Sequence, residues 1–202
     1  MWNKLFTELA GIASTSDREV DIILNELKAI SIHRWGEVRA IFADIGERVS
    51  NLYRRKKDKI ISYIEKVFGF KRFFTKLYVV YGFNPMPGMS FGTMLYFDDE
   101  NPVTAVYVND LHGESHVLDL AIHELLHGLI RLNSVELEHD IEELVIDVSA
   151  PDGYLSKIIG LVDRANARLE NVLYFQREAE RYKRLFDLLV EYCEKRSTTW
   201  LI

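Results

Sequence analysis

Residues 117–130 read Val-Leu-Asp-Leu-Ala-Ile-His-Glu-Leu-Leu-His-Gly-Leu-Ile, the most continuously apolar part of the expected helices. A helix built from it is apolar on nearly every side, and such a helix is buried. At its centre stands the pattern H-E-x-x-H, from His123 to His127. The spacing puts both imidazoles on one face, one turn apart, where they can bind one metal ion. Glu124 projects beside that pair and can reach a metal-bound water.

The polar groups of a buried helix need partners, because an unpaired buried charge is costly. A zinc ion with its water would supply them to His123, Glu124 and His127. The alternative is a pair of core histidines with a surface glutamate. Expected strands before the helix and an acidic helix after it favour the metal site. Asp119, one turn before His123, is expected to be a helix-start charge favoured by the helix dipole.

A tetrahedral catalytic zinc needs a third protein ligand and keeps one position for water. The longer pattern H-E-x-x-H-x-x-G-x-x-H is absent, because Ile130 stands at its Gly and Asn133 at its third His. Glu143 and Asp147 share one face of the next expected helix. We predict that Glu143 binds the metal and that Asp147 hydrogen-bonds the back of a ligating histidine; the same two carboxylates would also fit a solvated acidic face. Two alternatives for the third ligand remain open: Glu142 and His139.

These two motifs resemble those of the gluzincin class of zinc metallopeptidases, in which a helix carrying H-E-x-x-H precedes a helix carrying Glu-x-x-x-Asp. Here they read His123-Glu124-x-x-His127 and Glu143-x-x-x-Asp147. With a small three-stranded sheet before the first helix, the chain is similar to the compact minigluzincins. The resemblance covers about residues 77–150.

The resemblance implies a zinc metalloendopeptidase, a hydrolase that cuts peptide or protein substrates. The metal would polarise a carbonyl and lower the pKa of its water to about 7. Glu124 would take the proton from the attacking water and pass it to the leaving amine. Gluzincins also use a downstream side chain to stabilise the oxyanion, and Tyr154 is the candidate here. An edge strand of the sheet would run along the cleft, and two segments could supply it: Val103–Val108 and Phe91–Phe97.

The whole chain is predicted to be α+β and mostly helical. Helices are expected at 17–30, from 36 to 67 either continuously or with a break near Ser50, at 116–130 with Ser115 as cap, at 138–150, and over 154–196 as one long pattern or two. Strands are expected within 77–81, 91–97 and 103–108. Three segments follow, expected to form one compact unit: an N-terminal helical segment 1–76, a zinc-peptidase-like core 77–150 and a C-terminal long helical segment 151–202.

Composition excludes several classes. The 202 residues include one cysteine, Cys193, so an internal disulfide framework and a cysteine-based zinc cluster are excluded. No apolar run approaches the roughly 18 residues of a membrane span. Glu8 interrupts the apolar stretch of residues 1–12, which makes a poor signal peptide. We therefore expect an intracellular, cytoplasmic protein.

A competing function is binding of nucleic acid or of an acidic protein, with a structural or vestigial zinc site. Its basis is a basic run in an expected helix, which could contact phosphates weakly: Arg54, Arg55, Lys56, Lys57 and Lys59. The long helical flanks could also mediate a homo-oligomer. The apolar end, residues 198–202, is expected to be buried, on its own helical core or in the cleft.

Overall fold

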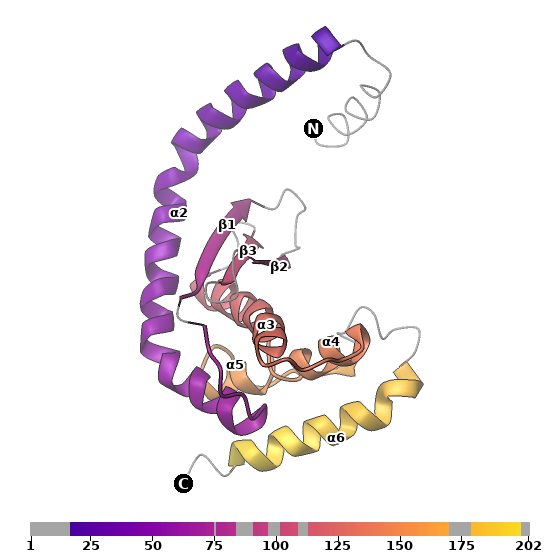
Figure 1. Ribbon diagram of the computed structural model, residues 1–202. Coiled ribbons are helices and arrows are strands. Elements are labelled where there is room, and N and C mark those ends of the chain that lie inside the picture. Colours follow the sequence, from indigo (N-terminus) through magenta and orange to yellow (C-terminus); the bar gives the residue numbers. More distant parts are fainter. Residues whose placement is uncertain are drawn as a thin grey trace. The chain divides into compact units, whose positions relative to one another are not determined.

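The computed structural model describes residues 17–74, 76–83, 91–96, 102–108, 113–169 and 179–198 (Figure 1). Its helices are α2 (Asp17–Val67), α3 (Glu114–Leu132), α4 (His139–Asp147), α5 (Tyr154–Ile158) and α6 (Ala179–Thr198). Its strands are β1 (Tyr78–Phe83), β2 (Phe91–Tyr96) and β3 (Pro102–Val108). The prediction of a mostly helical chain is confirmed. Among the described residues, no helix has both the length and the apolar character needed to cross a membrane.

The chain divides into two compact units, Met1–Glu47 and Arg48–Ile202. This division differs from the expected segments 1–76, 77–150 and 151–202, because the boundary falls inside α2. Val49 and Leu52, just past the boundary, are the first side chains of α2 that the structure describes as buried. The part of α2 after residue 47 therefore belongs with the strands and with α3 to α6. Residues 1–16 and 199–202 lie outside the described residues; they include the apolar stretch 1–12, interpreted as a poor signal peptide, and most of the apolar end.

Helix α2 is one continuous helix of 51 residues, so the separate helices expected at 17–30 and from 36 onward are wrong. Gly36 lies inside it without ending it, because a single interior glycine costs a helix only about 1 kcal/mol. The end of the helix is as predicted. Gly69 adopts a φ of 72°, a left-handed conformation that glycine takes without strain at helix C-termini.

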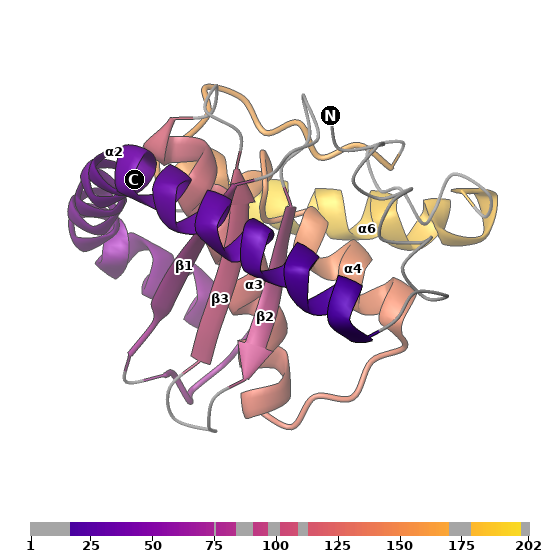
Figure 2. The ribbon, with the colours of Figure 1, turned by 90° about the horizontal axis from the view of Figure 1, so that it is seen from above.

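The three strands pair in the order β1-β3-β2 (Figure 2). Strand β1 runs parallel to β3, with Tyr78 opposite Val103, and β2 runs antiparallel to it, with Phe91 opposite Tyr107. Strand β3 is therefore central, and Val103–Val108 cannot be the edge strand. Within the described ranges β2 pairs with β3 alone, so Phe91–Tyr96 forms an edge.

Helix α3 packs against β2 and β3 and forms the centre of the core. Its apolar residues are almost all buried, as the all-round apolar pattern predicted; Leu126 has no exposed area. The helix begins after Gly113 without a side-chain cap, so the predicted cap at Ser115 is wrong. Beyond its end, the Asn133 side chain donates to the Arg72 carbonyl at 3.0 Å and accepts from the Arg72 amide at 3.1 Å. Asn133, which stands where the longer pattern has its third histidine, therefore links α3 to the segment that follows α2.

The helical pattern expected over 154–196, as one helix or two, corresponds among the described residues to two separate helices. Helix α5 has five residues and α6 begins only at Ala179. Gly160, with a φ of 70°, ends α5, and the amide of Leu161 donates back to the Ser156 carbonyl at 2.8 Å. This pattern is typical of a glycine-terminated helix. Helix α6 packs on α5 and turns one face inward, with three buried residues: Tyr182, Phe186 and Cys193.

We predict that Gly153→Ala destabilises the fold whereas Gly113→Ala does not. Both glycines have an extended backbone and stand at the N-cap of a helix, so replacing either by alanine changes the capping preference by the same amount. A Cβ at Gly153 would lie 2.4 Å from the Ser149 carbonyl carbon, but at Gly113 it would meet nothing within 4 Å. Overpacking of this kind costs about 1–3 kcal/mol. Denaturant unfolding of both variants measures the difference, and equal values would contradict the packing of this turn.

Candidate metal centre

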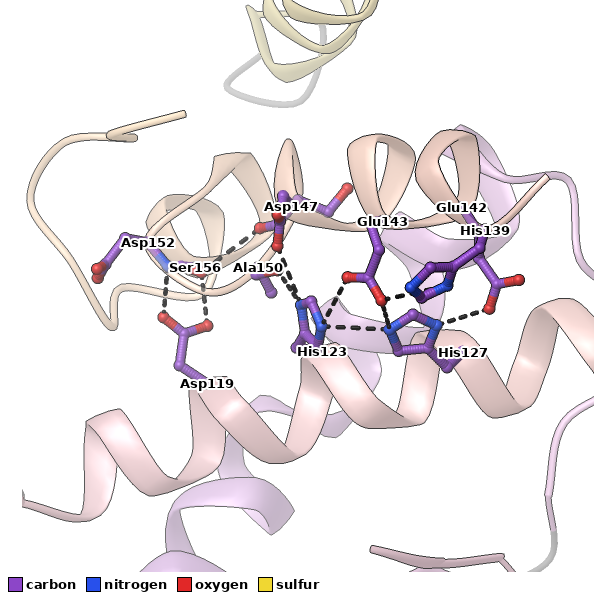
Figure 3. A network of polar contacts seen from close by, with 11 residues as sticks. Asp119, His123, His127, His139, Glu142, Glu143, Asp147, Ala150, Asp152 and Ser156 are labelled. Carbon is purple, nitrogen blue, oxygen red and sulfur yellow. Dashed lines mark hydrogen bonds and ion pairs between the residues drawn. The ribbon is translucent and has the colours of Figure 1, made fainter. Parts of the chain in front are cut away.

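The two histidines of α3 and one carboxylate of α4 converge (Figure 3). The Nε2 atoms of His123 and His127 lie 3.2 Å apart. The Glu143 carboxylate approaches both, with Oε1 3.3 Å from His127 Nε2 and Oε2 3.6 Å from His123 Nε2. Ligands at 2.0–2.1 Å from a tetrahedral zinc lie about 3.3 Å from one another. The two nitrogens therefore have this spacing, and each of them has one oxygen of Glu143 at a similar distance.

The outer nitrogens of both imidazoles are hydrogen-bonded to acceptors. His123 Nδ1 lies 2.9 Å from the Ala150 carbonyl oxygen, and because a carbonyl only accepts, this nitrogen carries a hydrogen. Asp147 Oδ1 lies 3.3 Å from the same nitrogen, where the sequence predicted it. His127 Nδ1 lies 2.6 Å from Glu142 Oε1. Both rings thus turn Nε2 toward Glu143, the orientation that a metal-ligating histidine needs.

The two alternatives for the third ligand occupy other places. Glu142 is directed at the outer nitrogen of His127 and away from the pair of Nε2 atoms. His139 is 63% exposed, and its Nδ1 lies 3.8 Å from Glu143 Oε1. The cluster of groups that could hold a metal contains Glu143 and neither of these residues. The arrangement favours Glu143 as the third ligand.

The electrostatics of the cluster favour positive charge between the histidines. Burial alone would lower the pKa of His123, but the hydrogen bond and charge of Asp147, the Ala150 carbonyl and the charge of Glu124 raise it to about 9. At His127, burial would also lower the pKa, but the hydrogen bonds with Glu143 and Glu142 outweigh it, so the pKa is raised. Burial would raise the pKa of Glu143, but its hydrogen bond with His127 and the two imidazole charges lower it. A proton bound to this pair of histidines therefore supplies the positive charge that a metal cation would supply.

Glu124 is buried but lies outside this group of donors. Its carboxylate lies against strand β2, where a Cβ built on Gly92 would be 2.9 Å from Glu124 Oε1 and 2.7 Å from its Cγ. Only a glycine leaves this space for the carboxylate. The sequence analysis missed Gly92, although an isolated glycine in a strand pattern often marks a close approach.

Tyr154 is not brought to the histidines in the way that the sequence predicted. Its hydroxyl donates to Glu194 Oε1 of α6 at 2.9 Å. Burial, together with this hydrogen bond and the charge of Glu194, raises the pKa of Tyr154. This contact links α6 to α5 and gives the hydroxyl a carboxylate partner, whereas the sequence analysis expected it to stabilise an oxyanion.

Comparison of the chain with protein-family models, with curated proteins and with solved structures finds no match.

We predict that the metal-free protein loses stability as the pH rises from about 6.5 to 9. The folded protein binds the His123 proton with a pKa of about 9, above the ordinary value of 6.5. A raised pKa stabilises the fold fully below the unfolded value, and this contribution disappears as the pH passes the folded value. The loss would be up to about 3 kcal/mol.

Denaturant unfolding of chelator-treated protein between pH 6 and 10 measures this loss. His123→Asn is the control, because it removes this titrating group and should reduce the loss to the part that comes from His127, whose pKa is also raised. A parent profile that stays level between pH 6.5 and 9 would contradict the prediction.

Proposed function

We propose that this protein is a zinc-dependent metalloendopeptidase, with zinc held by His123, His127 and Glu143. The observation that carries the proposal is the convergence of two imidazole Nε2 atoms and one carboxylate at 3.2–3.6 Å from one another. Two nitrogens and one oxygen suit zinc, and three protein ligands leave a fourth position for water or substrate, as catalytic zinc sites do. When bound, zinc would polarise a carbonyl and lower the pKa of water to about 7.

The side chains around the proposed zinc have separate roles. Glu142 and the Ala150 carbonyl keep a hydrogen on each Nδ1, so that each Nε2 lone pair is available to the metal. Asp147 adds negative charge behind His123. Glu124, next to a ligand in sequence but outside the donor group, acts as general base: it takes a proton from the attacking water and returns it to the leaving amine.

The proposed substrate is an extended segment of a peptide or protein. Strand β2 is an edge with the Glu124 carboxylate against its Gly92. A peptide added to this edge would gain main-chain hydrogen bonds beside the general base. The central strand β3 cannot serve, because both of its sides are paired.

We predict one zinc ion per chain. His123→Ala should abolish binding, and Glu143→Ala should weaken it strongly, because each removes one of three protein ligands. His139→Ala is the matched control from the same helix and should retain full zinc. Metal content after dialysis and competition with a chromophoric chelator measure both effects. Full zinc in Glu143→Ala with loss in His139→Ala would show that the third ligand is assigned wrongly.

We predict that Glu124→Gln keeps the fold and the zinc but removes hydrolysis. The amide is nearly isosteric with the carboxylate but cannot take a proton, and loss of general-base catalysis costs a factor of about 10² to 10⁴. The rate on any peptide that the parent cuts is the measurement, with zinc content and circular dichroism as controls. An unchanged rate would rule out this mechanism.

The alternative function, binding through the basic residues of α2, has one observation in its favour. Four of the five side chains are exposed: Arg54, Arg55, Lys57 and Lys59. Exposed basic side chains on a helix are also ordinary solvated groups. Nucleic-acid affinity that falls steeply with salt, together with no cleavage of peptides by the zinc-loaded protein, would favour this alternative. Cytoplasmic location and homo-oligomer formation stay predictions.

A further inference from the structure

A buried carboxylate that the proposed mechanism does not use lies one turn before His123 on α3. Asp119 is 2% exposed and lies in the second turn of α3, which begins at Glu114, so the expectation of a helix-start charge favoured by the dipole is wrong. Both of its oxygens are occupied. The Asp152 amide donates to Oδ2 at 2.9 Å, and the Ser156 hydroxyl donates to Oδ1 at 2.6 Å (Figure 3). Both donors belong to the short segment that follows α4.

This segment is folded tightly on itself. The amides of Tyr154 and Leu155 donate back to the carbonyls of Val148 and Ser149, each at 3.0 Å. Gly153 packs so closely on Ser149 that no side chain fits there. We call residues 149–156 the return turn. A buried carboxylate is stable only when it is hydrogen-bonded, so Asp119 and the return turn hold each other in place.

The return turn carries the acceptor that orients His123. Ala150 has no exposed area, and its carbonyl oxygen lies 2.9 Å from His123 Nδ1. Asp119 and His123 are four residues apart on one helix and therefore lie on neighbouring positions of one face. Asp119 accepts hydrogen bonds from Asp152 and Ser156 of the return turn, and His123 contacts the same turn at Ala150.

We propose that Asp119 is a positioning residue of the metal centre. It holds the return turn so that the Ala150 carbonyl fixes the His123 ring with Nε2 toward Glu143. The inference rests on the proposed function, because it assigns Asp119 a role toward the metal that this function requires. The competing explanation is that Asp147 orients His123 alone and that Asp119 only stabilises the fold.

The test compares two variants with one control. Asp119→Asn keeps the shape of the side chain but replaces one acceptor oxygen with an NH2 donor, which then faces the Asp152 amide or the Ser156 hydroxyl. Ser156→Ala is the milder change, which removes one donor and leaves the Asp152 bond. Phe186→Leu alters the buried face of α6 and serves as a destabilised control outside the return turn. Each protein is measured in full length for zinc affinity by chelator competition, for the visible spectrum of its cobalt(II) form, and for stability.

We expect both variants to bind zinc about 10- to 100-fold more weakly than the parent and to show altered cobalt(II) ligand-field bands. The control should keep parent affinity and spectrum despite its lower stability. If Asp119→Asn loses stability but keeps parent affinity and spectrum, the positioning role is overturned and Asp119 is only a fold anchor; if Asp119→Asn does not fold, Ser156→Ala decides in the same way. A parent protein that binds neither zinc nor cobalt would instead overturn the proposed function, and the metal-positioning role with it.

Discussion

Two imidazole nitrogens held 3.2 Å apart on a buried helix are the constraint on which the rest of the second unit depends. Each ring already commits its Nδ1 hydrogen, His123 to a carbonyl and His127 to a carboxylate. Two neutral rings would then face each other lone pair to lone pair, and the burial of α3 keeps bulk water from relieving this repulsion. A proton or a cation has to lie between them. The raised pKa of both histidines and the lowered pKa of Glu143 express this demand.

The carboxylates of helix α4 supply the negative charge that stabilises this proton or cation. Three of its carboxylates approach the histidines, and each has a different contact: Glu142 with the back of His127, Glu143 with both Nε2 atoms, Asp147 with the back of His123. The helix therefore is not the solvated acidic face that its sequence also permitted. Residues beyond α4 complete the arrangement, since the chain folds back and binds α3 again one turn before the first histidine.

The predictable part of the site is the part that depends on spacing within one helix. His123 and His127, or Glu143 and Asp147, share a face whatever the tertiary structure, so the sequence could predict both pairs. The choice between Glu142 and Glu143 depends on how α4 is rotated against α3, which no periodicity fixes. Ala150 contributes a backbone carbonyl, which has no residue-type signature. Asp119 depends on a turn more than 30 residues away, and the central position of β3 depends on its parallel pairing with β1. The glycine at position 160 could have predicted the end of α5, whereas the apolar periodicity just beyond it wrongly indicated further helix.

Helix α3 presents the three polar residues of its H-E-x-x-H motif to two different elements, and this division explains why the helix must be buried. His123 and His127 contact α4, whereas Glu124, the residue between them in the motif, has its carboxylate against Gly92 of β2. A ligand face and a base face on one helix require packing on both sides, which only an apolar remainder can provide. The absent side chain of Gly92 then sets how closely the edge strand approaches the base. In the proposed peptidase, the strand that would hold the substrate and the helix that would hold the metal thus meet at the general base.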